Sequence, residues 1–195
     1  MNVLFIRHGL TEWNLQGRAQ GLEDIELNEG GMKQAVFCGE ALRDFEPIDC
    51  IVTSPLKRAR VTAEHIAQYH RNVPFLVIND FIERDLGLLS GKTGAEMDAI
   101  RKSGIDTRTE SRPDVAKRAM KALAVLEKDF PNGNVFIITH GGVITSVLQF
   151  LEYEGVGHIF LDNVFVTEIS YVHGKCDVLR CNISPDRLRE SFSNS

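Results

Sequence analysis

The sequence lacks the features that mark secreted, membrane-spanning and disulfide-rich proteins. No apolar run approaches the ~18–20 residues that cross a bilayer, and the run at residues 3–6 is too short for a signal peptide. Only 4 of the 195 residues are cysteine, and none are in CxxC spacing. This pattern predicts free thiols in a reducing compartment. We therefore expect a cytoplasmic protein that does not bind membranes.

Positive charge is also in the minority. The chain has 22 Lys and Arg residues against 27 Asp and Glu residues, a formal net charge of -5. Such a chain is poorly suited to coating nucleic acid, so we expect no nucleic-acid partner. Any anionic ligand must be met by a local cluster of cations. The 43% hydrophobic content and the length are typical of a globular chain with one compact core.

Strand and helix patterns alternate along the chain. Apolar runs predict strands at residues 3–6, 48–53, 74–78 and 135–139, and a late hairpin at 164–172 and 176–183. Amphipathic patterns predict helices at 28–45, 55–70, 115–130 and 142–151. The alternation predicts an α/β fold, a three-layer α/β/α sandwich whose mostly parallel sheet has an antiparallel edge strand. We expect the polar tail from residue 185 to fray.

Cationic and imidazole side chains follow three of the predicted strands. Arg7 and His8 end the first strand, Arg58 follows the second and His140 follows the fourth. The carboxyl ends of parallel strands share one edge of a sheet, where ligands bind. Guanidinium groups match phosphate oxygens, Gly141 opens a helix N-terminus suited to anions, and imidazole forms covalent intermediates. One such histidine alone is more often structural, but the set predicts a phosphoryl site.

These residues also carry a family resemblance. The segment RHGLTEWN at residues 7–14 resembles the signature of the histidine phosphatase superfamily, the phosphoglycerate mutase-like proteins. Further motifs follow in the family's order: QG at 20–21, LNEGG at 27–31, QA at 34–35, SPLKRA at 54–59, Glu83 with Gly87 and Gly91, THGG at 139–142 and DN at 162–163. The resemblance implies a single domain over residues 1–195 with a phosphoglycerate mutase-like fold and a short cap insertion at about 88–112.

The resemblance implies a role for each residue of the candidate site. His8 is the nucleophile that becomes phosphohistidine, and Glu83 is the proton donor and later the proton acceptor. The residues that hold the phosphoryl group or lie beside it are Arg7, Arg58, His140, Asn14, Gln20, Gly21 and Gly141. Two arginines and a second histidine can neutralise phosphoryl oxygens without a metal. We therefore expect neither a metal nor a cofactor.

Three features of the middle segment allow competing interpretations. Asp85 is a second candidate for the acid, but Glu83 keeps the family's spacing to the two glycines that follow. The segment GLLSGKT at 87–93 resembles a P-loop, but it has three residues between its glycines where four are needed, so we do not expect ATP binding. A loose basic group is either a solvated face or a screen for the substrate's charge; it comprises Arg101, Lys102, Arg108 and Arg112.

The sequence therefore predicts a phosphomonoesterase acting on a small phosphorylated metabolite. The alternative is a phosphoglycerate mutase, which returns the phosphoryl group to the bound product. A phosphoprotein-directed regulator or a catalytically silent binding module is less favoured, because every expected catalytic residue is present. Mutases of the family are typically longer, and only a short stretch separates Glu83 from the helix predicted at residue 115, which favours the phosphatase. A homodimer is compatible with the sequence.

Overall fold

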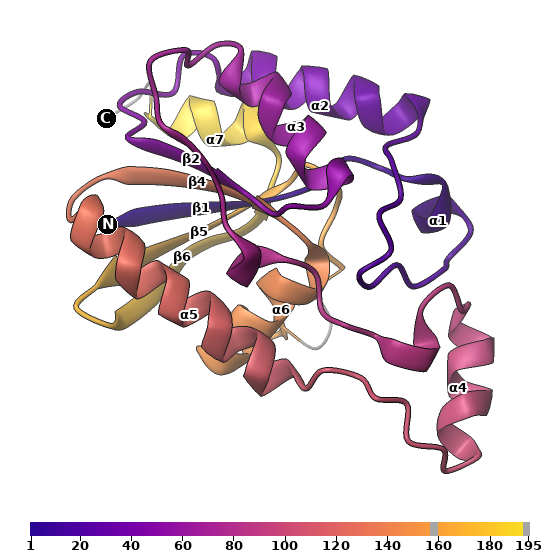
Figure 1. The fold of residues 1–195 in the computed structure, drawn as a ribbon. Helices are drawn as coiled ribbons and strands as arrows, with labels where there is room; N and C mark the ends of the chain where they lie inside the picture. Colours follow the sequence, from indigo (N-terminus) through magenta and orange to yellow (C-terminus); the bar gives the residue numbers. More distant parts are fainter. Residues whose placement is uncertain (157–159, 193–195) are drawn as a thin grey trace.

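A six-stranded sheet forms the centre of the computed structural model, which describes residues 1–156 and 160–192 (Figure 1). Its strands are β1 (Asn2–Arg7), β2 (Cys50–Thr53), β3 (Phe75–Val77), β4 (Asn134–Thr139), β5 (Val166–Val172) and β6 (Lys175–Ile183). They lie in the order β3-β2-β4-β1-β5-β6. The pairs β3-β2, β2-β4 and β4-β1 are parallel, whereas β5 is antiparallel to both of its neighbours.

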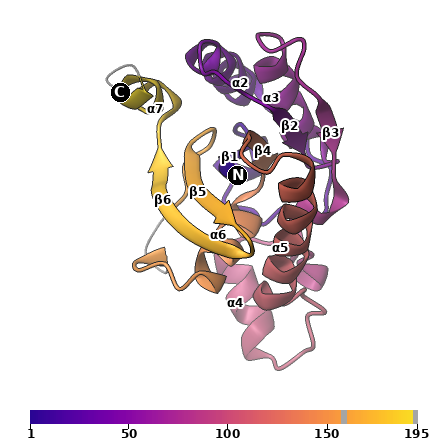
Figure 2. The ribbon, with the colours of Figure 1, turned by 90° about the vertical axis from the view of Figure 1, so that its left-hand side faces the viewer.

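Helices cover both faces of this sheet. One face carries α2 (Glu29–Leu42), α3 (Lys57–Ala67) and α7 (Pro185–Phe192), and the other carries α5 (Arg112–Asp129) and α6 (Gly141–Phe150) (Figures 1 and 2). Alternate residues of β1 enter separate buried clusters, with Val3 and Phe5 on the α5–α6 side and Leu4 and Ile6 on the α2–α3 side. Because β1 is buried on both faces, its residues 3–6 are all apolar and do not alternate with polar ones. The predicted three-layer α/β/α fold is confirmed.

The antiparallel strand lies one place further inside the sheet than the sequence analysis expected. β5 pairs with β1, and β6 forms the edge beyond it. His173 and Gly174 join the two strands, and both have positive φ, as a tight two-residue hairpin requires. Because such a turn places the second strand directly beside the first, the hairpin adds two strands to the same side of the sheet.

The glycine- and charge-rich middle segment contains a helix that its composition conceals. Besides the 3-10 turns η1 (Asn79–Phe81) and η2 (Gly87–Leu89), it forms α4 (Gly94–Lys102). Thr93 and Glu96 make a capping box: the Thr93 hydroxyl accepts from the Glu96 N–H, and the Glu96 carboxylate accepts from the Thr93 N–H at 2.8 Å. A similar cap at Thr11 starts the short helix α1 (Glu12–Leu15). No residue of α4 is buried.

The expectation of a fraying tail is wrong for residues 185–192, and residues 193–195 lie outside the described part of the chain. The segment forms α7, which packs against α2 (Figure 2). Leu188 is fully buried in the cluster that contains Leu4 and Ile6. Leu188 and Phe192 are the two large apolar residues of an otherwise polar stretch, which is a weak periodic signal. The burial of Leu188 is nevertheless enough to dock a short helix.

We predict that Leu188→Ala lowers the free energy of unfolding by about 2–5 kcal/mol, the usual cost of removing a buried leucine side chain. Urea denaturation measures this change. The control is Arg187→Ala on the exposed side of the same helix, which should change stability by less than about 0.5 kcal/mol. Equal stability of Leu188→Ala and the unmutated protein would contradict the docking of α7.

Candidate active site

The register of two parallel strands brings the two strand-end histidines together. In the β1–β4 pair, Arg7 lies opposite Thr139. The next residues, His8 and His140, therefore leave the sheet side by side, and their ring centroids are 5.1 Å apart. The His8 N–H donates to the Thr139 carbonyl at 2.9 Å, which extends the strand pairing to the nucleophile candidate. Both imidazoles are buried.

The hydrogen bonds of His8 define its tautomer. Its Nδ1 lies 2.6 Å from the Gly9 carbonyl oxygen. A carbonyl oxygen can only accept, so Nδ1 carries the proton and Nε2 keeps a free lone pair. Burial, together with the positive charges of Arg58 and Arg7, holds the pKa of His8 well below its usual value. The ring is therefore neutral and nucleophilic at neutral pH.

The backbone around His8 is fixed by side chains from distant parts of the sequence. Asn163 Nδ2 donates to the His8 carbonyl at 2.7 Å, and the Gly9 N–H donates to Thr62 Oγ1 at 3.1 Å. The Leu10 N–H donates to Gln34 Oε1 at 2.8 Å. The QA and DN motifs thus supply, through Gln34 and Asn163, two of the groups that hold this turn in place.

Main-chain carbonyls hold the buried side chain of Arg58. It lies in the first turn of α3, and its side chain is fully buried. Nη1 donates to the Glu23 carbonyl at 2.6 Å and Nη2 to the Gly21 carbonyl at 2.9 Å. Burial lowers the pKa of Arg58 to about 10, so the guanidinium stays charged at neutral pH. Arg7 is held similarly, because its Nη1 donates to the Leu161 carbonyl.

Several buried hydrogen-bonding atoms at this edge have no protein partner. Within residues 1–156 and 160–192, Arg7 Nε, Arg58 Nε and His140 Nδ1 are buried and make no hydrogen bond. The other ring nitrogen of His140, Nε2, lies 2.7 Å from Ser54 Oγ. Leaving a buried polar atom unpaired costs ~1–3 kcal/mol, and charged donors cost more. Donors concentrated next to His8 form a site that matches an oxyanion.

Glu83 lies in the same cavity as His8. Its Oε1 accepts from the Arg84 N–H at 2.8 Å, and its Oε2 accepts from the Gly142 N–H at 3.3 Å. A Cβ on Gly142 would collide with Glu83 Oε1, so the close approach requires glycine at this position. Asp85, the competing acid, is exposed and accepts from the Gly87 N–H at 2.8 Å. It does not line the cavity.

The cavity is a cleft of about 250 Å³ at the carboxyl ends of the strands. Its lining residues are Arg7, His8, Asn14, Arg18, Ala19, Gln20, Gly21, Glu83, Arg84, Leu86, Arg112, Gly141 and Gly142. Seven of the nine predicted site residues are in this set. The other two, Arg58 and His140, are fully buried; Arg58 bonds to the Gly21 carbonyl and the His140 ring packs beside His8.

An ion pair that the sequence analysis did not identify ties the Glu83 segment to α5. Arg118 Nε donates to Glu110 Oε1 at 2.8 Å. The same guanidinium donates to the Asp80 carbonyl at 2.6 Å and to the Glu83 carbonyl at 3.3 Å. Nothing in the spacing of Glu110 and Arg118 marks this contact, because it depends on how the loop folds onto the helix.

The loose basic group splits into cavity residues and surface residues. Arg112 lines the cavity, together with Arg18 and Arg84, which no motif identified. Arg101 lies on the exposed helix α4, where Nη1 is 3.1 Å from Asp98 Oδ1. Lys102 and Arg108 are exposed as well.

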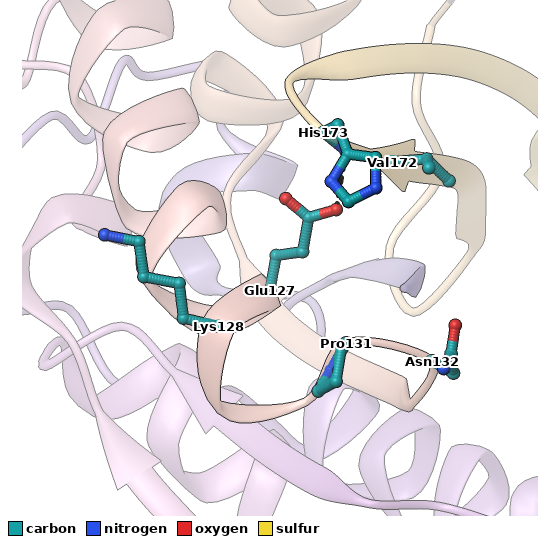
Figure 3. A pocket seen from close by; sticks show the side chains of 6 residues that line it. All are labelled: Glu127, Lys128, Pro131, Asn132, Val172 and His173. Atoms are coloured by element: carbon teal, nitrogen blue, oxygen red, sulfur yellow. Dashed lines mark hydrogen bonds between the residues drawn. The ribbon is translucent and has the colours of Figure 1, made fainter.

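A second hollow, of about 430 Å³, lies at the opposite end of the strands (Figure 3). The end of α5 and the β5–β6 turn form this hollow. A hydrogen bond from the His173 N–H to Glu127 Oε1 at 2.6 Å joins the two elements. None of the predicted site residues line it. Among the described residues, no group of three or more His, Cys, Asp or Glu side chains could hold a metal ion, and no helix is long and apolar enough to cross a bilayer.

The fold and the site define an α/β protein whose sheet edge brings together two buried histidines and two arginines with unpaired donor atoms. The family model of the histidine phosphatase superfamily (branch 1) matches residues 3–184, and the chain belongs to this superfamily. The predicted family is therefore confirmed, and with it phosphomonoester hydrolysis as the activity.

Similar proteins carry phosphatase names. The chain is 41% identical over 146 residues to the uncharacterized phosphatase PhoE of Bacillus subtilis. This match covers 75% of each chain. It is 33% identical over 180 residues to the metal-independent phosphoserine phosphatase of Arabidopsis thaliana. This second match covers 86% of this chain and 76% of the relative. The structure of a mycobacterial glucosyl-3-phosphoglycerate phosphatase in complex with VO3 matches with a TM-score of 0.81 at 29% identity, covering 94% and 99% of the two chains.

The buried histidines predict a loss of stability in mild acid. Burial holds the pKa values of His8 and His140 well below 6.5 and lowers that of His70. Unfolded histidines protonate near pH 6.5, so the unfolded state binds more protons below that pH. The free energy of unfolding should therefore fall by about 2–3 kcal/mol between pH 6.5 and 5.5, roughly 1 kcal/mol per histidine. The fall from pH 7.5 to 6.5 should be smaller, about 1 kcal/mol or less in total.

Urea denaturation in buffers without phosphate measures this dependence. The exposed His173 supplies the control, because His173→Gln should keep the same pH profile. Unchanged stability from pH 7.5 to 5.5 would mean that His8 and His140 are not held neutral in the folded protein.

Proposed function

We propose that the protein is a metal-independent phosphomonoesterase that hydrolyses a small phosphorylated metabolite through a phosphohistidine on His8. The observation that carries the proposal is the set of buried, unpaired donors on Arg7, Arg58 and His140 around the free lone pair of His8 Nε2. Phosphoryl transfer needs positioning and neutralisation of the phosphoryl oxygens more than covalent chemistry from the protein. The names of the phosphatase relatives support the same activity.

In the first step, His8 Nε2 attacks phosphorus in line with the ester oxygen. A P–N bond forms, the P–O bond to the leaving group breaks, and the leaving oxygen takes a proton from the Glu83 carboxyl group. Arg7 and Arg58 offset the charge on the phosphoryl oxygens. His140 donates through Nδ1 when Ser54 donates to its Nε2, an arrangement open to Ser54 because a hydroxyl can donate or accept.

In the second step, water attacks phosphorus from the side that the product alcohol has left. Glu83, now a carboxylate, takes a proton from that water while the P–N bond breaks. Inorganic phosphate leaves, and His8 regains its neutral ring with the proton on Nδ1. Its bond to the Gly9 carbonyl holds this tautomer throughout, so the lone pair of Nε2 is ready for the next substrate.

Hydrolysis rather than mutase chemistry is supported by the segment around α4, which we propose as the short cap on a single domain. A mutase must keep water away from its phosphohistidine while the product reorients. No residue of α4 is buried, and the helix stands apart from the sheet (Figure 1). A cap packed this loosely leaves the phosphohistidine open to water.

We predict that His8→Ala abolishes the phosphoenzyme. Protein mixed with a ³²P-labelled phosphomonoester and then denatured should carry an acid-labile, base-stable label, because a P–N bond behaves in this way. His8→Ala should carry none, whereas His173→Ala at an exposed position should be labelled like the unmutated protein. A label that persists in His8→Ala would place the covalent intermediate on another residue.

We predict that Glu83→Gln lowers kcat by ~10²–10⁴-fold on alkyl phosphates, the usual contribution of a general acid. The loss should be much smaller on p-nitrophenyl phosphate, because its leaving group needs little protonation. Asp85→Asn is the matched control and should have little effect on either substrate. Equal losses on both substrates in Glu83→Gln would indicate a positioning role, and a loss confined to Asp85→Asn would transfer the acid role to Asp85.

A further inference from the structure

The hydroxyl of Ser54 is buried beside His140, one residue past the end of β2. We infer that Ser54 is a positioning residue, which fixes His140 as the tautomer with its proton on Nδ1 and so makes this histidine a donor to the phosphoryl group. The inference rests on the proposed function, because it takes a phosphoryl oxygen as the partner of Nδ1. The position of the proton matters, since a lone pair on Nδ1 would repel an oxyanion.

The pairing of β2 with β4 holds Ser54 in place. Thr53 lies opposite Ile138 in this parallel pair, and the Ser54 N–H donates to the Ile138 carbonyl at 3.0 Å. The pairing therefore continues one residue past β2, beside the end of β4, where His140 follows. Ser54 Oγ lies 2.7 Å from His140 Nε2, a hydrogen-bonding distance between two fully buried side chains.

The donors and acceptors around Ser54 determine the direction of this hydrogen bond. The Leu56 N–H can only donate, and it donates to Ser54 Oγ at 3.3 Å. Within residues 1–156 and 160–192, Ser54 Oγ makes two hydrogen bonds, one with this N–H and one with His140 Nε2. The hydroxyl proton therefore has one acceptor, His140 Nε2. In the opposite direction, the proton of a fully buried hydroxyl would have no acceptor, which is costly in a protein interior.

With Nε2 as an acceptor, the proton of a neutral His140 ring lies on Nδ1. Burial, and after it the positive charge of Arg58, hold the pKa of His140 well below its usual value, so the ring is neutral at neutral pH. His140 Nδ1, Arg7 Nε and Arg58 Nε are all buried and have no partner among the described residues. Neither guanidinium atom donates to Nδ1, as expected if Nδ1 is itself a donor. The three atoms together can serve one oxyanion.

His8 and His140 thus have the same tautomer but leave opposite nitrogens free. In His8, the Gly9 carbonyl accepts the Nδ1 proton, which leaves the Nε2 lone pair for attack on phosphorus. In His140, the Ser54 hydroxyl donates to Nε2, which leaves the Nδ1 proton for a ligand. A carbonyl can only accept, whereas this hydroxyl accepts from a main-chain N–H and so donates to the ring. The groups behind the two rings therefore make one histidine the nucleophile and the other the donor.

Nitrogen NMR of protein labelled with ¹⁵N-histidine tests the inference without turnover. The chemical shift of each ring nitrogen shows whether it has a proton, and the signals lost in His140→Asn identify His140. In phosphate-free buffer at pH 7.5, we expect the unmutated protein to have the His140 proton on Nδ1. Ser54→Ala removes the donor to Nε2, so the His140 shifts should move towards those of the Nε2–H tautomer. Ser54→Thr keeps the hydroxyl and should keep the proton on Nδ1.

The same variants provide a kinetic comparison. Ser54→Ala should lower kcat/KM for p-nitrophenyl phosphate by about 10–100-fold, the scale of one hydrogen bond to a charged group. This substrate is chosen because its leaving group needs little protonation, so the change does not depend on Glu83. Ser54→Thr should recover most of the loss. The matched control is Thr167→Val, which removes a buried hydroxyl of β5 that contacts Cys181 Sγ and should leave both kcat/KM and the His140 shifts unchanged.

Two results would overturn the inference while leaving phosphatase activity in place. One is a His140 ring protonated on Nε2 in the unmutated protein, a measurement that decides the matter even if Ser54→Ala folds poorly. The other is an unchanged Nδ1–H tautomer in Ser54→Ala, which would make any loss of its activity a structural effect. A protein that releases no phosphate from p-nitrophenyl phosphate would contradict the proposed function, and the NMR comparison would still decide whether Ser54 fixes the tautomer of His140.

Discussion

The parallel pairing of β1 with β4 is the constraint on which the rest of the site depends. With Arg7 opposite Thr139, the chain leaves both strands at the same height, and His8 and His140 meet without any special loop geometry. A one-residue slip would turn every β1 side chain to the opposite face, exchanging the residues of the two buried clusters. The register that packs the core is therefore the register that pairs the histidines.

Two arginines whose unpaired Nε atoms are buried, and which form no salt bridge within residues 1–156 and 160–192, give the site its chemical character. Arg58 is fully buried and held by main-chain carbonyls, so its charge is positioned but not neutralised. The same field, together with burial, keeps the neighbouring imidazoles neutral. Desolvation and unpaired donors reduce the stability of the folded protein, and a bound oxyanion would restore the missing contacts. The affinity for phosphate that we propose and this cost in stability thus have one physical origin.

The sequence predicts the parts of this arrangement that follow from strand order and short motifs. His8, Arg58 and His140 each follow a strand of the parallel sheet, so their convergence needs no knowledge of the loops. Glu83 could be chosen over Asp85 only through the spacing of a family resemblance, and the structure supplies the geometric reason, since Glu83 faces the cavity and Asp85 does not.

The residues that prediction missed are those whose role depends on tertiary contacts. Arg118 and Glu110 are charged residues with unremarkable spacing until the loop folds onto α5. Leu188 lies in a stretch that is polar apart from Pro185 and Phe192, and its burial depends on the apolar cluster beneath α2 that it joins. Arg112 is one of the four basic residues of the loose basic group. The sequence gives no means of telling that Arg112 lines the cavity whereas the other three lie on the surface.

Glu83 and the helix after His140 also depend on each other, which links the proposed acid to the phosphoryl site. The Gly142 N–H at the start of α6 donates to Glu83, and the absence of a side chain at Gly142 lets the carboxylate approach. Gly141, one residue earlier, lies against Arg7. The two glycines of the THGG motif therefore differ. A Cβ on Gly141 would only touch Arg7 Nε at 3.5 Å, which is an ordinary contact, whereas a Cβ on Gly142 would occupy the space of the Glu83 carboxylate. A side chain at Gly142 would push the Glu83 carboxylate away from the start of α6, and with it the group that we propose as the acid.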